Sequence, residues 1–515
     1  MPRFLLSHLR GLTTWLTFVG LVLGTALAQS PSAPSGTLRY GAAYDHGSLD
    51  PQLLSSVGDR QMANNVFEGL VRYVAGGTVI EPSLASDWVH NESGTDWTFN
   101  LVQGVQFHKD FGELTAEDVV FTIERLLDPE LNSPNRSLMA SVVSVTAPSK
   151  YQVRFELSEP DPAFLDKLAN WFTFIVSKEA VEERGDSFGD DPVGTGPYQF
   201  GHWLPQQETV LTAFQDYWRG PPALAEVAFI SIPDPTTMYN AFESGDVDII
   251  FVTDADKLKR YANDSSIGVD SVPGLITRFF GMNTDFQPFA NAQVREAVTL
   301  AVDREGMMTY LFPGISTAAD SILAPGVLHV KRGVVHYELD LERARRLLAE
   351  AGYPDGFSVT FSVPNIDRFT LPAAVIQENL AQIGIAATIE VIETQTYMAT
   401  LQTKGYDMFI LTRTQDATPD RTLYTWFHSS EIPLNNWAKV VDPDVDMWLD
   451  RATTITDEQE RDELFGLVQQ RIADGNFYYF IDHENMIFAY HDYVIGFIGN
   501  PQRSFRLDNV RLEGR

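Results

Sequence analysis

Four glycines in the second half of the chain each separate a segment of helical pattern from a segment of strand pattern. The pairs of glycine and following strand are Gly245 and 247–251, Gly352 and 357–363, Gly384 and 387–392, and Gly405 and 407–411. Glycine can adopt the left-handed backbone conformation that satisfies the last carbonyls of a helix, so each junction is a physically sound helix end. This repeated order predicts α/β lobes built on mixed sheets that are flanked by helices.

The first half mixes amphipathic helices with alternating strands. Apolar residues form one helical stripe over 60–70, and they alternate with polar residues over 97–101 and 151–157, as in half-buried strands. Thr115 is expected to begin a helix through a capping box in which Asp118 is the reciprocal partner. The sequence has no fixed-period repeat, and its length allows two or three cores of ordinary domain size.

The first residues have the pattern of an export signal. Arg3 and Arg10 give a basic start, residues 12–23 are apolar, and small residues form an A-x-A pattern at 26–28. This pattern predicts a signal peptide over 1–28 that is cleaved after export, and a Pro/Ser/Gly-rich linker over 29–36. The apolar run is too short to span a bilayer comfortably, so we expect no direct membrane insertion.

Cysteine content and net charge limit where the protein can be located and which partners it can bind. The chain has 0 cysteines, so it has neither disulfides nor the lipid-bearing cysteine of a bacterial lipoprotein, which favours a periplasmic location over a lipid-anchored one. Its formal net charge of −32 repels phosphate backbones and anionic headgroups. We therefore expect no nucleic-acid partner and no direct membrane-surface role.

Eleven segments, spread in order over most of the chain, carry a family resemblance. They are SLDP at 48–51, VFEGL at 66–70, EPSLASDW at 81–88, WTFNLVQGVQFH at 97–108, LTAEDVVFTIERLL at 114–127, GTGPY at 194–198, DYWRGPPAL at 216–224, ESGDVDII at 243–250, PFANAQVREAVTLAVDRE at 288–305, ARRLLAEAGYPDGF at 344–357 and IQENLAQIGI at 376–385. Together they resemble family 5 of the bacterial extracellular solute-binding proteins, which serve ABC importers of oligopeptides, dipeptides and nickel. Most of these segments have a scaffold role, so the resemblance bears more on fold than on ligand.

The resemblance implies a two-lobed periplasmic binding protein fold of type II, with mixed sheets flanked by helices. Two crossing strands would join the lobes, and a ligand would bind in the cleft between them and favour closure. The expected parts are lobe I over 37–63, 195–277 and 487–515, a subdomain inserted in lobe I over 64–194, and lobe II over 278–486. The implied partners are a small-molecule or peptide ligand and an ABC permease with its ATPase subunits, and we expect a monomer.

One lobe II loop, 413–420, contains the first candidate binding residues. In peptide-binding relatives an aspartate of the comparable loop pairs with the terminal ammonium of the peptide, and here Asp416 is the candidate, shifted by one position. It pairs with a ligand amine or it only stabilises the loop. Arg413 is expected to bind a ligand carboxylate, or else to form a salt bridge with Asp416 or Asp420, which is itself a candidate.

Other candidates come from several segments, of which the first, after the first strand, lines the cleft in relatives. Each has a plainer alternative role in the core, in the crossing strands or in solvent. They are Tyr44 and Asp45 after the first strand, Arg368 as a second carboxylate partner, Trp426 and Trp437 near the opening, and Arg278 and Phe280 at the hinge.

No enzyme motif is convincing. The G-x-S-x-G string at 185–189 is expected to be a surface loop, because a charged segment precedes it where a nucleophile elbow needs a buried strand. There is no P-loop, and the scattered histidines predict no metal site, so we expect no catalytic residue and no cofactor. The leading prediction is a peptide receptor for an ABC importer. The alternatives are the same receptor for a sugar, an opine or a metal chelate, then an exported hydrolase or an interaction module.

Overall fold

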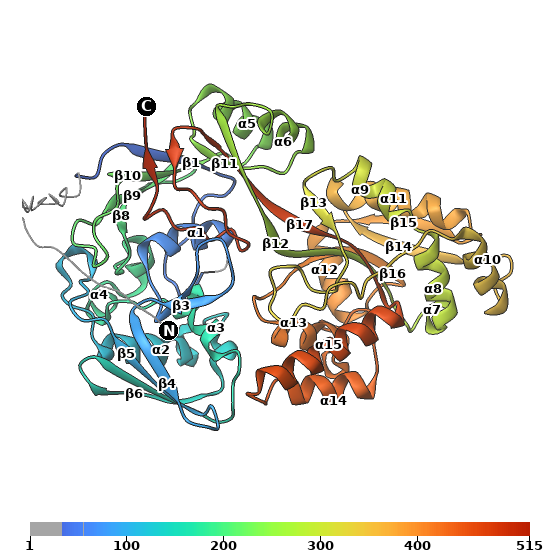
Figure 1. The fold of residues 1–515 in the computed structure, drawn as a ribbon, viewed down its shortest axis with the longest axis horizontal. Helices are drawn as coiled ribbons and strands as arrows, with labels where there is room; N and C mark the ends of the chain where they lie inside the picture. The colour runs from blue at the N-terminus through green and yellow to red at the C-terminus, as the bar shows by residue number, and fades with distance from the viewer. Residues whose placement is uncertain (1–32, 55, 515) are drawn as a thin grey trace, which may run out of the picture. The chain divides into compact units, whose positions relative to one another are not determined.

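An eleven-stranded mixed sheet runs through the computed structural model of the protein, with strand order β15-β14-β16-β12-β17-β11-β1-β10-β9-β8 and β13 paired to β17 (Figure 1). The structure describes residues 33–54 and 56–514. The expected signal peptide over 1–28 and the start of the linker lie outside these residues. In the described part, no helix has the length and apolar character needed to cross a membrane.

Two long antiparallel strands, β12 (Ile267–Met282) and β17 (Tyr478–His491), connect the two halves of this sheet. Figure 1 shows them passing from the part that contains β1 to the part that contains β14. On one side are β1 (Thr37–Ala42), β8 (Tyr198–Leu204), β9 (Glu208–Ala213), β10 (Glu226–Ser231) and β11 (Ile249–Phe251). On the other side are β13 (Ser316–Ala318), β14 (Ser358–Pro364), β15 (Ala386–Ile392) and β16 (Met408–Thr414).

The first side, here called lobe I, also contains three smaller sheets. The four-stranded one has the order β4-β5-β7-β6 and is formed by β4 (Ala85–His90), β5 (Asp96–Leu101), β6 (Val142–Ser149) and β7 (Gln152–Leu157). The two-stranded ones pair β2 (Val71–Tyr73) with β3 (Ile80–Pro82) and β18 (Val494–Ile495) with β19 (Arg511–Leu512). Its helices are α1 (Val57–Val66), α2 (Ala116–Leu127), α3 (Phe164–Leu168), α4 (Lys178–Arg184), α5 (Pro235–Ser244) and α6 (Ala255–Tyr261).

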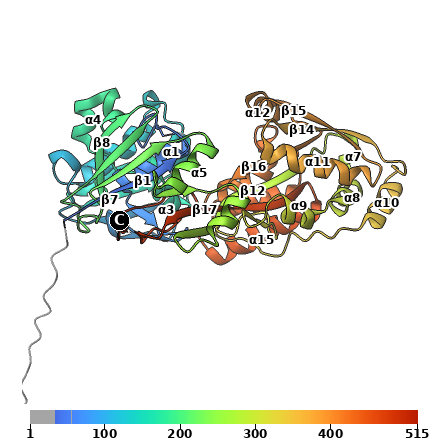
Figure 2. The same ribbon diagram turned by 90° about the horizontal axis from the view of Figure 1, so that it is seen from above.

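The second side, here called lobe II, packs helices on both faces of its part of the sheet. Neighbouring residues of β16 show this: Met408 and Ile410 belong to one buried cluster, and Phe409 belongs to the other. The first cluster packs α7 (Gln287–Ala290), α8 (Ala292–Ala301), α9 (Arg304–Tyr310), α10 (Leu341–Glu350) and α11 (Asp367–Ala381). The second packs α12 (Thr394–Thr403), α13 (Pro419–Phe427), α14 (Pro443–Ala452) and α15 (Glu458–Gly475). Figure 2 labels α12 and α15 in a view from above.

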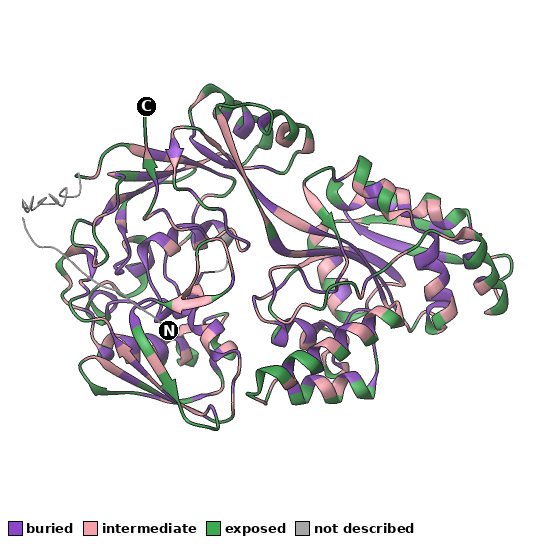
Figure 3. Ribbon diagram, in the orientation of Figure 1, coloured by how far each residue is buried: buried purple, intermediate pink, exposed green. Residues whose placement is uncertain are grey.

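Buried residues follow the pattern of the sequence. Figure 3 shows the sheet strands largely buried and the outer surfaces of α14 and α15 exposed. One hydrophobic cluster runs without interruption from β1 through the four-stranded sheet to residues 486–510. Lobe I and its expected inserted subdomain therefore share a continuous core.

The predicted helix ends are confirmed at the four glycines, which all have a positive φ of 75° to 93°. The predicted capping box of α2 is also confirmed, because the Thr115 N–H donates to Asp118 Oδ2 at 2.9 Å. The helix expected over 60–70 instead spans 57–66. Ser56 caps it earlier, since its hydroxyl accepts from the Asp59 N–H, and Gly69 lies too close to the Leu168 carbonyl to carry a side chain.

Candidate functional site

The crossing strands carry a buried group of charges between the two lobes. Arg278 on β12 is the cross-strand neighbour of Asp482 on β17 and is 4% exposed. Its guanidinium donates to Glu484 Oε1 at 2.8 Å, lies 3.5 Å from Asp482 Oδ1 and covers the Phe312 ring at 4.0 Å. Burial raises the pKa of Asp482 to about 6. Charged groups this deeply buried are expensive unless they have a partner or a function.

Residues from both lobes meet at Glu484. From lobe II, the Arg368 guanidinium at the start of α11 lies 3.9 Å from Glu484 Oε1. From lobe I, Arg503 and Tyr44 interact electrostatically with each other, and Arg503 also does so with Glu484. The structure therefore brings two predicted site residues, Arg278 and Arg368, to the carboxylate of Glu484. Sequence reasoning missed Glu484 and Arg503, because their part in this charged group depends on the tertiary fold and no local motif marks either residue.

The loop after β16 holds Asp416 in an ion pair with its own neighbour. Arg421 donates from Nε and Nη2 to the two Asp416 oxygens, at 2.7 and 2.8 Å. Gln415, directly before it, is buried and bonded internally, because its side chain accepts from the Ala324 N–H and donates to Thr277 Oγ1, both at 2.7 Å. Internal bonds therefore hold both residues, and Asp416 remains partly exposed.

Three polar side chains of lobe I, those of Tyr73, Asp166 and Arg60, interact with this loop. Tyr73 donates a hydrogen bond to Asp166, and the Asp166 carboxylate is buried. Burial raises the pKa of Asp166 to about 7, the charge of Asp416 adds to the increase, and Arg421 opposes it. Arg60, on α1, covers the Trp171 ring at 3.6 Å and also interacts with Asp416 and Arg421. Arg60 and Asp166 of lobe I therefore interact electrostatically with Asp416 and Arg421 of lobe II.

Arg413 lies between two tryptophan rings. Its guanidinium is 4.7 Å from the Trp426 ring and 4.2 Å from the Trp437 ring, and Nη1 donates to the Asn435 carbonyl at 3.0 Å. Burial lowers the pKa of Arg413 to about 9. The alternative salt bridge to Asp416 or Asp420 does not form, because both aspartates pair with other arginines. Both tryptophans are buried core residues.

Three other predicted site residues have structural partners. Asp420 is buried and receives two hydrogen bonds from Arg461, at 2.7 and 2.8 Å. Phe280 is fully buried and stacks on Tyr479, with ring centroids 4.9 Å apart. Asp45 accepts from Trp203 Nε1 at 3.0 Å and from the Gln206 N–H at 2.6 Å, so it holds the turn between β8 and β9.

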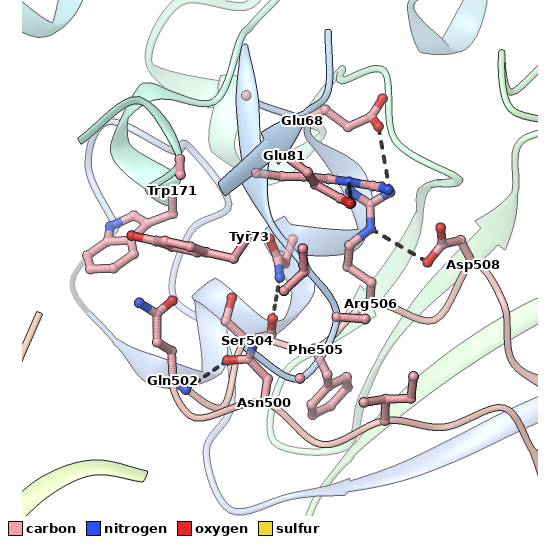
Figure 4. Close-up of a pocket in the computed structure, with 18 of the residues that line it drawn as sticks. Glu68, Tyr73, Glu81, Trp171, Asn500, Gln502, Ser504, Phe505, Arg506 and Asp508 are labelled. Carbon is pink, nitrogen blue, oxygen red and sulfur yellow. Dashed lines mark hydrogen bonds and ion pairs between the residues drawn. The ribbon is translucent and has the colours of Figure 1, made fainter. Parts of the chain in front are cut away.

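A pocket in lobe I was not predicted. It lies between the β2–β3 hairpin, residues 169–174 and the segment 496–509, and Figure 4 shows its polar lining. Among its lining residues is the buried Glu68, whose carboxylate accepts hydrogen bonds from Tyr217 Oη at 3.0 Å and Trp218 Nε1 at 2.8 Å, and Arg506 lies 3.6 Å away. The motifs VFEGL and DYWRG contain Glu68, Tyr217 and Trp218, and sequence analysis gave both motifs a scaffold role.

Two further features of the described residues bear on catalysis and metal binding. The G-x-S-x-G string forms a short 3₁₀ helix, Gly185–Asp190, after the helix α4, so the strand that a nucleophile elbow needs is missing there. The expectation of a simple surface loop is wrong in one respect, since Phe188 and Gly189 are buried and Gly189 packs against Ser48. Within residues 33–54 and 56–514, no three His, Asp or Glu side chains are grouped as metal ligands.

Comparisons with known proteins give one consistent result. A family model described as bacterial extracellular solute-binding proteins, family 5, middle region, matches residues 79–433. Heme-binding protein A of Haemophilus influenzae is 28% identical over 475 residues, which are 86% of each chain. The glutathione-binding protein GsiB of Salmonella paratyphi A is 26% identical over 518 residues, 97% of this chain and 98% of the relative.

A solved structure extends this result to the fold. The ABC transporter-associated periplasmic binding protein DppA from Helicobacter pylori, in complex with the peptide STSA, is similar with a TM-score of 0.76 and 28% identity. The match covers 93% of this chain and 98% of the other. The similarity therefore includes both lobes and the crossing strands, and the predicted two-lobed α/β fold is confirmed.

Proposed function

The chain belongs to the bacterial extracellular solute-binding proteins of family 5, and on that premise we propose that it is the substrate-binding receptor of an ABC importer for a peptide or peptide-like solute. The observation that carries this proposal is the meeting of charged side chains from both lobes at the crossing strands, around Glu484. A solute held there touches both lobes. It therefore favours the lobe arrangement in which both sets of contacts form.

The comparisons support a peptide-like ligand. One similar structure holds a four-residue peptide, and one relative is named for glutathione, itself a modified tripeptide. We propose that Tyr44, Arg278 and Arg368 contact the ligand near Glu484, and that Asp416 pairs with a ligand ammonium in competition with Arg421. We assign Asp45, Phe280 and Asp420 to the scaffold, because each is already bonded or packed within its own lobe.

The role in transport follows from the proposed receptor function. The protein binds its solute without covalent chemistry and delivers it, as a monomer, to a permease with ATPase subunits. Export through a cleaved signal peptide over 1–28 would place it in the periplasm, where such a receptor meets both solute and permease.

A thermal-shift screen with di-, tri- and tetrapeptides tests the ligand class. A ligand at 100 times its Kd is expected to add about 2.7 kcal/mol to the free energy of unfolding, because it binds only the folded state. Isothermal titration calorimetry then gives Kd for each hit, and mass spectrometry identifies any solute that co-purifies. Stabilisation by sugars or opines, with none by any peptide, would contradict the peptide assignment and leave the receptor role intact.

A further inference from the structure

The loop of the β2–β3 hairpin joins the two lobes directly. Thr78, in this loop, donates a hydrogen bond from its hydroxyl to the carbonyl oxygen of Gly326 in lobe II, at 2.7 Å. Thr78 is 8% exposed, whereas its neighbour Val79 is 60% exposed. The hairpin therefore buries one polar side chain against the other lobe and leaves the next, apolar one in solvent.

The hairpin loop is ordered by contacts within lobe I. The Val74 N–H donates to the Val79 carbonyl at 2.8 Å and closes the loop. Gly76 has a positive φ of 74°, and a Cβ there would lie 3.0 Å from Ile498 Cγ2, so the loop packs tightly against the segment after β18. Because the loop is already ordered, its contact with lobe II immobilises few further groups.

The lobe II segment that accepts this hydrogen bond is bonded to the loop after β16. The Ala324 N–H donates to Gln415 Oε1 at 2.7 Å. The Leu328 N–H donates to the Ala417 carbonyl at 2.8 Å. These two bonds hold the residues directly before and after the candidate aspartate of that loop, so the hairpin contacts a segment that supports the proposed binding site.

The same segment is connected to the crossing strands. Gln415 Nε2 donates to Thr277 Oγ1 of β12 at 2.7 Å, and Thr277 Oγ1 lies 2.9 Å from His483 Nδ1 of β17. All three side chains are buried, and burial lowers the pKa of His483 to about 4, so its ring is neutral. A buried network whose members are hydrogen-bonded favours one arrangement of its parts.

A second contact joins the lobes at another hairpin. A Cβ added to Gly94, in the turn between β4 and β5, would lie 3.0 Å from Thr456 Cγ2, between α14 and α15. The lobes therefore touch at two points through protein atoms alone. A contact that exists in only one arrangement of two lobes favours that arrangement.

We propose that the β2–β3 hairpin is a strap that holds the lobes in the arrangement of this structure, here called closed, and that Thr78 is its positioning residue. The strap acts with or without a bound solute, so this inference goes beyond the proposed receptor function. Apparent affinity scales with the fraction of molecules in the competent arrangement. The strap therefore raises the affinity for all solutes together and does not select between them.

Spin labels on the two lobes test the proposal without any solute. The chain has 0 cysteines, so the double variant Val89→Cys/Met447→Cys carries labels only at exposed positions of β4 and α14. Double electron–electron resonance then gives the distribution of distances between the labels in dialysed protein. We expect Thr78→Val in this background to raise the ratio of long to short distances about two- to tenfold, as for the loss of one hydrogen bond.

Three further variants assign the effect to the hydroxyl. Thr78→Ala is expected to behave like Thr78→Val, and Thr78→Ser, which keeps the hydroxyl, is expected to restore the wild-type distribution. The control is Thr146→Val on the exposed face of β6, which is expected to leave the distribution unchanged. Circular dichroism gives the melting temperature of each variant, which we expect to stay close to that of the wild-type protein.

Two results would overturn the strap. One is a wild-type distance distribution in Thr78→Val and Thr78→Ala, and the other is a shift in Thr78→Ser as large as that in Thr78→Val. Neither result bears on the receptor function, because the experiment contains no solute. Conversely, a failure of every peptide in the thermal-shift screen would leave the distance measurement and its interpretation intact.

Discussion

At the scale of single residues, charge pairing distinguishes side chains that look equivalent in the sequence. Asp416 and Asp420 are four positions apart, and each pairs with an arginine through both carboxylate oxygens. The first pair is partly exposed and the second is buried, because Arg461 is 2% exposed. The sequence of this one loop does not encode the difference in burial, so it could not tell the partly exposed aspartate from the buried one.

The two aspartates are expected to differ in their effect on stability. Asp420→Asn leaves the buried Arg461 with only the exposed Glu458 as its counter-charge and should lower the free energy of unfolding by about 3–5 kcal/mol. Asp416→Asn breaks a partly exposed pair and should cost about 1 kcal/mol or less. Urea denaturation followed by circular dichroism measures both, with Asp416→Asn as the matched control. Equal losses in the two variants would contradict this account of their burial.

Asp166 is expected to make stability depend on pH. Its pKa rises from 3.8 to about 7 because the carboxyl is buried near Asp416, so the folded state holds this proton more tightly than the unfolded state does. The stability that the proton provides is complete below pH 3.8 and is lost as the pH rises to about 7, by up to about 1.4 kcal/mol per pH unit. Asp166→Asn removes this dependence.

Melting temperatures between pH 5 and pH 8 test the prediction for Asp166. Relative to the wild-type protein, Asp166→Asn should become progressively more stable as the pH rises, whereas the exposed control Asp186→Asn should stay parallel to the wild-type curve. A constant difference between Asp166→Asn and the wild-type protein across this range would show that Asp166 is already charged.

At the scale of elements, the sequence predicted the helix ends better than the site. A glycine after a helical stripe has a local physical meaning, and all four glycines have the expected left-handed conformation. The site residues Tyr44, Arg278, Arg368, Glu484 and Arg503 come from separate elements, and only the tertiary fold brings them together. Reading one segment at a time selected Tyr44, Arg278 and Arg368 as candidates, which stay predictions, and gave no indication of Glu484 or Arg503.

Two glycines near the start of β14 provide a graded test of backbone strain. Gly352 has φ of 93° and open space around it, so Gly352→Ala should cost about 1–2 kcal/mol from conformation alone. Gly356 has φ of 76°, and a Cβ there would lie 1.9 Å from the Gly384 carbonyl oxygen, so Gly356→Ala should cost more. Urea denaturation of the two variants provides the comparison. If Gly356→Ala lowers the free energy of unfolding less than Gly352→Ala does, the backbone near Gly384 can move away from the added Cβ.

At the scale of the whole molecule, the ordered motifs predicted the two-lobed α/β fold and its crossing strands. They did not predict that one hydrophobic cluster unites lobe I with the segment expected to be an inserted subdomain, so the boundaries at 63–64 and 194–195 remain predictions. They also did not predict the lobe I pocket, because its lining comes from both ends of the chain. Motifs report local structure, whereas a pocket requires distant segments to meet.

The position of β17 in the sheet has a consequence for how the protein is made. This strand lies between β11 and β12, in the middle of the sheet, yet it is formed by residues 478–491. Neither half of the sheet can complete its hydrogen bonding until the ribosome has synthesised almost the whole chain. A chain that has been synthesised only as far as β16 therefore lacks the strand that joins β11 to β12.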